Sequence, residues 1–301
     1  YDFRGEMMIP IHEVIINHLN EISGLANDLQ TYCAAHDSNF SSKIRRNSIR
    51  IVALFVGIPI VTVFPLMVYS FSNGLVLAPV VMREVIIALV PLQLLGIYFD
   101  DADILIQCDI ASEFYRQIEM VLVDKEEYLK GSHGSVRLVE VRKWHQFLRR
   151  IRRIVDQIGS ITKVPQLLSL LEVTGNLTVF WYTVFNLVAS TNTPLLDNYS
   201  VKISIIYVAI SLIRIHVKTL KAEQVTAAEG RVHDALFTLN TLPQAFDVQL
   251  ELQGMRNTIS TAPTRIAFGN YLVLHKGVIV SMFNQVVTYL IVLLQFDRAT
   301  S

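Results

Sequence analysis

The sequence predicts an all-α protein, a polytopic bundle of helices that crosses a membrane several times. Apolar residues make up 52 % of the chain and charged residues only 17 %, whereas soluble domains contain roughly 25 % charged residues. Residues 277–296 contain no charge at all. At about 1.5 Å per residue, a helix of this length crosses the hydrocarbon core of a bilayer, which is about 30 Å thick.

Four further spans are expected upstream of this last one. Residues 51–71 are free of charge, and their prolines are tolerated where neighbouring helices satisfy the freed carbonyl groups. Residues 75–99 are apolar except for Arg83 and Glu84, which we place near the outer interface because charges at mid-membrane are costly. Residues 173–189 and 203–213 complete the set, the latter being extended by its neighbours to reach across.

The third span has an unusually long approach. An amphipathic pattern begins near Trp144 and continues to Leu171, where the apolar span takes over. We therefore expect one helix that starts in water and continues into lipid.

Lysines and arginines near the span ends predict the orientation. They are concentrated in residues 43–50, 142–163 and 214–221, whereas residues 72–74 and 190–200 contain none. Five spans then place the N-terminus in the cytoplasm and the C-terminus outside. Asn198 begins an Asn-Tyr-Ser glycosylation acceptor in an external loop, so we expect Asn198 to carry a glycan.

The last span contains a row of polar residues. Ser281, Asn284, Gln285, Thr288 and Gln295 recur at steps that place them along one side of a helix. Hydrocarbon cannot satisfy amides and hydroxyls, so this row must face protein or water. It lines either a seam between helices or a pore, and the residues alone favour a seam.

The end of this span resembles a known signature. Thr288-Tyr289 is followed by five apolar residues and by Gln295-Phe296, a pattern that resembles the C-terminal signature of insect gustatory receptors. Weaker resemblances lie upstream, at residues 114–119, at 155–159 and at 167–168. That family has seven spans, of which five are counted here.

The resemblance implies a chemosensory channel of the plasma membrane. It implies a ligand-gated, non-selective cation channel, with permeating cations and with cytoplasmic helices that meet in an anchor around the last span. Its four copies form a homotetramer or a hetero-oligomer. With it, the pore becomes the favoured interpretation of the polar row. We expect Gln295 at a constriction and Thr288 on the pore wall, with Ile291, Val292 and Leu294 next to a gate.

A small tastant would bind in the outer half of the bundle. Sites for small molecules combine apolar walls with a few polar groups, and the outer part of the third span offers both. The candidate ligand-binding residues are Thr178, Trp181, Tyr182 and Asn186 on this span, with Tyr207, Arg83 and Glu84 on its neighbours. A sugar and a bitter alkaloid suit them equally, and an interfacial aromatic belt accounts equally well for Trp181 and Tyr182.

These expectations divide the chain into three parts. Residues 1–50 form a cytoplasmic amphipathic segment, and residues 51–241 form the ligand-binding bundle with cytoplasmic helical extensions. Residues 242–301 form the C-terminal anchor and pore helix. Long helices are expected over residues 100–129 and 214–235, with a break at residues 130–135.

Other classes of function find little support. The zero net charge gives no reason to expect nucleic acid, and the two cysteines form no framework of disulfides or metal ligands. No phosphate-binding loop, dinucleotide fingerprint or nucleophile elbow is present, so we expect no enzyme activity, cofactor or metal. A secondary transporter, which should show internal repeats, and a non-conducting membrane scaffold remain as alternatives.

Overall fold

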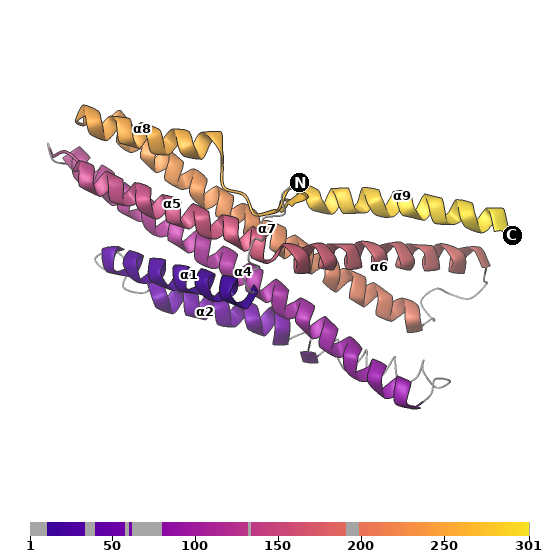
Figure 1. The fold of residues 1–301 in the computed structure, drawn as a ribbon. Helices are drawn as coiled ribbons and strands as arrows, with labels where there is room; N and C mark the ends of the chain where they lie inside the picture. The colour runs from indigo at the N-terminus through magenta and orange to yellow at the C-terminus, as the bar shows by residue number, and fades with distance from the viewer. Residues whose placement is uncertain are drawn as a thin grey trace, which may run out of the picture. The chain divides into compact units, whose positions relative to one another are not determined.

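The computed structural model describes residues 11–33, 40–57, 60–61, 80–131, 134–190 and 199–300, and nearly all of them are helical (Figure 1). The elements are α1 (Ile11–Cys33), α2 (Phe40–Val52), the π-helical turn η1 (Ala53–Gly57), α4 (Val80–Gly131), α5 (Leu138–Ile161), α6 (Lys163–Ser190), α7 (Tyr199–Thr241), α8 (Phe246–Thr261), β1 (Ala267–Phe268), β2 (Leu272–Val273) and α9 (Gly277–Thr300). The predicted all-α class is confirmed.

Two of the described helices are long and apolar enough to cross a membrane, at Lys163–Phe185 in α6 and Gly277–Phe296 in α9. The second coincides with the predicted last span. The predicted spans at 75–99 and 203–213 fall within the long helices α4 and α7, apart from residues 75–79, which lie outside the described residues. Most of the predicted first span, 51–71, also lies outside them.

The expectation of one continuous helix from Trp144 through Leu171 is wrong, because the chain breaks at Thr162 between α5 and α6. Pro165 explains the break. Its ring nitrogen cannot donate to the carbonyl of Ile161, so a helix cannot continue through this point without losing a hydrogen bond. A proline is tolerated in a first turn, and Pro165 lies in the first turn of α6.

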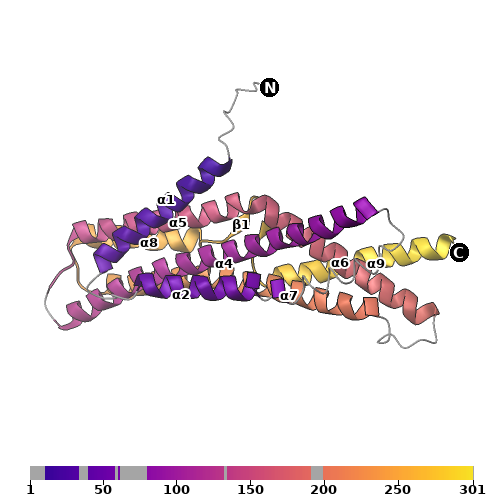
Figure 2. The ribbon, with the colours of Figure 1, turned by 90° about the horizontal axis from the view of Figure 1, so that it is seen from below.

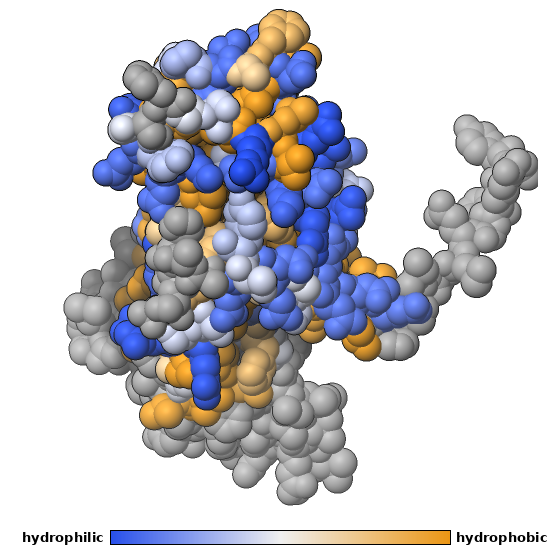
Figure 3. Space-filling view, turned by 90° about the vertical axis from the view of Figure 1, so that its left-hand side faces the viewer, coloured by the Kyte–Doolittle hydropathy of each residue, from blue (hydrophilic) through white to orange (hydrophobic). Residues whose placement is uncertain are grey.

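The described parts of residues 1–45, 107–161 and 224–269 form one compact unit. In it, α5 packs against α1, α8 and β1, and Figure 1 shows α8 and α1 on opposite sides of α5. The strongly amphipathic α5 buries one stripe, which includes Trp144, Leu148, Ile151 and Ile158. Figure 3 faces the side where α8, α5 and α1 lie in Figure 1, and the described side chains there are mainly hydrophilic.

The described parts of residues 46–106, 162–223 and 270–301 form the second unit. Here α6 packs against α9, and the two helices lie side by side in Figure 1 and cross in Figure 2. Their contact is an apolar core of Val173 and Leu177 from α6, Ile215 from α7, and Val278, Met282 and Val286 from α9. Helices in a membrane associate through close packing, because lipid tails are as apolar as these side chains, and this packed core fixes which face of α9 points inward.

Candidate functional site

The packed face of α9 recurs every fourth residue. Val278, Met282, Val286 and Leu290 are all buried within the protomer. Successive residues of a helix are separated by about 100°, so positions 284, 288 and 295 lie on the opposite side. Asn284, Thr288 and Gln295 are indeed exposed, and the Thr288 hydroxyl donates to the Asn284 carbonyl at 2.9 Å. Within the described residues, the polar row of the last helix is therefore left uncovered.

The predicted pore residues occupy two faces of α9. Ile291, Val292 and Gln295 are exposed, together with Thr288. Leu294 is half-buried and follows Leu290 by four residues, so it continues the packed face. Ser281, Asn284, Thr288, Ile291 and Gln295 follow one another at steps of three and four, which is the spacing of a seam between helices.

The candidate ligand-binding residues of α6 do not form a closed site within the described chain. Trp181 is 39 % exposed and its ring centroid lies 5.5 Å from that of Phe180 and 6.4 Å from that of Phe185. Tyr182 is half-buried. The buried Thr178 hydroxyl donates to the Thr174 carbonyl at 2.8 Å, so it is occupied within its own helix.

The other candidates are placed less fully. The Tyr207 hydroxyl of α7 donates to the Glu172 carboxylate of α6, which joins the two helices. Arg83 and Glu84 belong to α4 and Asn186 to α6, but their side chains lie outside the described part of the structure. Asn198 lies outside the described residues altogether.

A buried charge cluster was missed by sequence reasoning. Asp101 of α4 accepts from Arg214 Nε at 2.6 Å and from Lys218 Nζ at 2.7 Å, both on α7. Lys218 also donates to Gln166 of α6 at 2.8 Å, and the Arg214 guanidinium lies over the Tyr98 ring. Lys218 lies beyond the predicted span 203–213, and burial lowers its pKa while Asp101 opposes this shift. The spacing of Arg214 and Lys218 on one helix face was the available signal.

A second cluster, also missed, surrounds Thr264 in the connection between α8 and β1. Its main members are Thr264, Glu229, Arg152, Tyr115 and Thr226, and we call it the Thr264 cluster. Glu229 is 1 % exposed and accepts from the Thr264 N–H at 2.5 Å and from the Thr264 hydroxyl at 2.6 Å. Arg152 compensates the buried carboxylate, with its Nε 3.2 Å from Glu229 Oε1.

The start of α9 has its own partner on α7. Glu223 accepts from the Lys276 N–H at 3.0 Å and forms an ion pair with the Lys276 ammonium at 2.6 Å. These hydrogen bonds to Lys276 lower the pKa of Glu223. This carboxylate lies near the N-terminus of α9, where a negative charge interacts favourably with the helix dipole.

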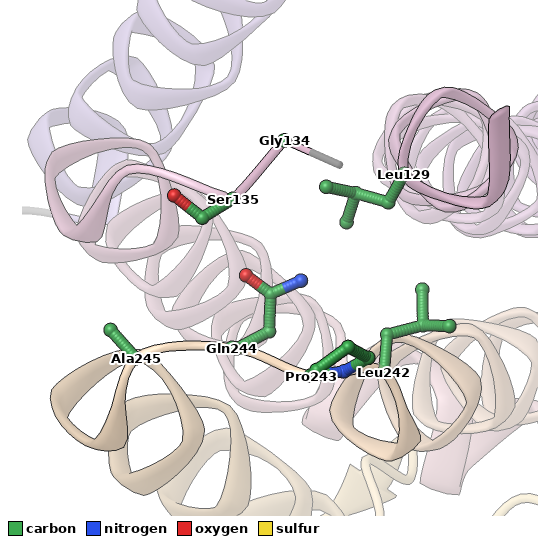
Figure 4. A pocket seen from close by; sticks show the side chains of 7 residues that line it. All are labelled: Leu129, Gly134, Ser135, Leu242, Pro243, Gln244 and Ala245. Atoms are coloured by element: carbon green, nitrogen blue, oxygen red, sulfur yellow. The ribbon is translucent and has the colours of Figure 1, made fainter. Parts of the chain in front are cut away.

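An open pocket of about 410 Å³ lies between the α4–α5 and α7–α8 connections, lined by Leu129, Gly134, Ser135, Leu242, Pro243, Gln244 and Ala245 (Figure 4). Gln244 Oε1 accepts from the Val136 N–H at 2.9 Å, which joins the two connections. The lining includes no titratable side chain, so the pocket offers no acid–base chemistry. Across the described ranges, no three His, Cys, Asp or Glu side chains gather as metal ligands would.

Comparison with known proteins places this arrangement among chemosensory receptors. A family model described as 7tm Chemosensory receptor matches residues 15–300. The fold is similar to the insect olfactory receptor OR5 from Machilis hrabei, with a TM-score of 0.61, 14 % identity, and coverage of 95 % of this chain and 77 % of that one. A structure of the same receptor in complex with eugenol gives a TM-score of 0.60 and 18 % identity, with coverage of 95 % and 75 %.

A comparison with curated proteins gives no match. The family model nevertheless extends over nearly the whole chain, from α1 to α9, and the similar structures share its helical fold. The chain belongs to the 7tm chemosensory receptor family.

Proposed function

We propose that this receptor is a ligand-gated, non-selective cation channel of the plasma membrane, with its N-terminus in the cytoplasm and its C-terminus outside. The observation that carries the proposal is the uncovered polar row of α9. Asn284, Thr288 and Gln295 lie opposite the face that packs against α6. At membrane depth such groups must meet protein or water, and the described residues of the protomer do not cover them.

Four copies around an axis satisfy this requirement. With the packed face of α9 held against α6, its opposite face points toward the axis, and the rows of the four protomers surround a conduit. Gln295 then forms a polar ring and Ile291 an apolar ring one turn away. An apolar ring closes a pore by dewetting, so a modest rotation that brings Thr288 or Val292 to the axis changes conduction.

The individual pore residues fit this arrangement to different degrees. Gln295, Thr288 and Ile291 lie on the row itself, and Val292 flanks it. Leu294 lies on the packed side, where a change in its contacts accompanies rotation of the helix. We assign Gln295 to the constriction and Ile291 to the gate.

The proposed ligand is a small tastant in the outer half of the bundle, contacted by Thr178, Trp181, Tyr182, Asn186, Tyr207, Arg83 and Glu84. The complex of the similar olfactory receptor with eugenol supports a small-molecule ligand. The exposed Trp181 face would stack on the C–H face of a sugar, and we propose this class as the tastant. Ligand binding opens the channel only through tighter binding to the open state.

The decisive experiment is electrical. Cells that express the chain alone and are given a tastant panel with sugars should show a ligand-evoked cation current. Gln295→Ala should change the relative permeability of cations by several-fold, whereas Gln253→Ala on exposed α8 should not. Saturable uptake without current would favour a transporter, and neither response would favour a scaffold; either result contradicts the proposal.

A further inference from the structure

The connection between α8 and α9 is held by one residue through all of its polar atoms. The Thr264 N–H and hydroxyl donate to Glu229, and the Thr264 carbonyl accepts from the Thr226 hydroxyl at 2.9 Å. Arg152 Nε donates to the Thr264 hydroxyl oxygen at 3.2 Å, and the Tyr115 hydroxyl lies 3.1 Å from it. A loop residue on a protein surface would usually leave some of these groups to water.

The partners of Thr264 come from three helices, and Tyr115 and Glu229 are buried whereas Arg152 and Thr226 are half-buried. Tyr115 belongs to α4, Arg152 to α5, and Thr226 and Glu229 to α7. Burial raises the pKa of Tyr115 above its ordinary range, and the charge of Glu229 adds to this shift, so the hydroxyl stays protonated near neutral pH. Arg152 also donates to the carbonyls of Thr258, at 3.2 Å, and of Ala262, so it holds the end of α8 as well.

The segment after Thr264 is held just as closely. A Cβ on Gly159 of α5 would stand only 2.2 Å from the Ala267 carbonyl oxygen, so β1 approaches the α5 backbone at a place where only glycine fits. Beyond the turn at Gly269, whose φ is 62°, β2 leads to Lys276 and the Glu223 contact.

One helix therefore holds both ends of the connection. Glu229 of α7 holds Thr264 before the hairpin, and Glu223 of α7 holds Lys276 after it. The same helix carries Tyr207, a proposed ligand-binding residue, bonded to Glu172 of α6. A displacement of α7 then reaches the start of α9 through hydrogen bonds instead of being absorbed by a loose linker.

We propose that Glu229 and Thr264 are positioning residues for gating, which fix the connection between α8 and α9 to α7 so that ligand binding moves the pore helix. This inference rests on the proposed channel function and deepens it. Neither residue touches ligand or ion. Their role is to keep the connection attached to α7, so that a movement of α7 is passed on to α9.

Hydrogen exchange of the full-length receptor tests whether the cluster holds the connection. Thr264→Val preserves the side-chain volume but removes the hydroxyl, whereas Thr264→Ser retains it. A buried hydrogen bond to a charged group accounts for about a tenfold or larger difference in local opening. Amides of residues 262–268 should exchange at least about tenfold faster in Thr264→Val and Glu229→Gln. They should exchange at the wild-type rate in Thr264→Ser and in the α7 control Thr238→Val, which removes a hydroxyl that bonds the Asp234 carbonyl of its own helix.

Ligand-evoked current tests the gating role. Divided by the amount of receptor at the cell surface, the maximal current should fall at least about fivefold in Thr264→Val and Glu229→Gln. The ligand concentration for half-maximal response should stay the same or rise, because weaker gating also weakens the apparent affinity for ligand. Thr264→Ser and Thr238→Val should retain the wild-type current. A role in folding alone would lower the surface amount and leave the normalised current unchanged.

Each outcome decides one point. If the amides of residues 262–268 exchange at the wild-type rate in Thr264→Val, the cluster does not hold the connection. If they exchange faster but the normalised current is undiminished, the cluster has no role in gating. A wild-type receptor that conducts nothing under any tastant would overturn the channel function and the gating role with it, while the exchange result would still decide whether Glu229 holds Thr264. Thr264→Val keeps the test open if Glu229→Gln fails to fold.

Discussion

Asp101 is a buried carboxylate that neutralises two cations in the second compact unit. It is fully buried and faces two buried cations, Arg214 and Lys218. Asp101→Asn leaves both cations without a carboxylate, and breaking a buried ion pair costs about 3–5 kcal/mol. Thermal unfolding of the purified receptor should show a loss of this size. Glu127→Gln, at an exposed position of α4, should change stability little, and equal stability of the two variants would contradict the assignment.

At the scale of residues, the sequence predicts where polar side chains lie on a helix better than it predicts which distant residue each one bonds. The row of Asn284, Thr288 and Gln295 is visible in the sequence because hydrocarbon leaves amides and hydroxyls few choices. The pairing of Glu229 with Thr264 is not visible, because the two lie 35 residues apart and nothing in their own segments identifies the partner. Such pairings arise only when distant helices pack together.

At the scale of elements, the contact between α5 and β1 offers a sharp test. Gly159→Ala places a methyl group against the Ala267 carbonyl oxygen, and overpacking of this kind costs typically about 1–3 kcal/mol. The expected result is a lower unfolding temperature and faster exchange in β1. Gly230→Ala on α7 meets no atom within 4 Å and should be neutral or slightly stabilising, since alanine favours helix. A neutral Gly159→Ala would show that β1 can move away at no cost.

Residues 100–129 of α4 and 214–235 of α7 were predictable as helix because their periodicity continues without a proline. Two local signals in the sequence indicate features that this periodicity does not predict. Pro165 indicates the break between α5 and α6, and Gly269-Asn270 between short apolar runs indicates the β1–β2 turn. The hairpin consists of two-residue strands, so it has no pattern of alternation, and its position follows from packing on α5.

At the scale of the whole molecule, the seven-span family explains why a chain with 52 % apolar residues leaves so many of them exposed in one copy. As a multi-pass membrane protein of a non-enzymatic family, it presents apolar side chains to lipid. Exposed residues of α9 include Phe283, Val287 and Phe296 beside the polar row. The sequence could not assign these faces, because lipid and neighbouring subunits both favour apolar side chains.

The accessibility of cysteines introduced into α9 tests the proposed pore. Thr288→Cys lies on the uncovered face of α9 and Met282→Cys on the packed face, so a water-soluble cationic thiol reagent should block ligand-evoked current only in Thr288→Cys. The native cysteines are 3 % and 1 % exposed, so their background reaction should be slow. In a tetramer, each reagent adds one positive charge per subunit near the axis, which repels cations. Rapid block of Met282→Cys, or none of Thr288→Cys, would mean that water reaches a different face of α9.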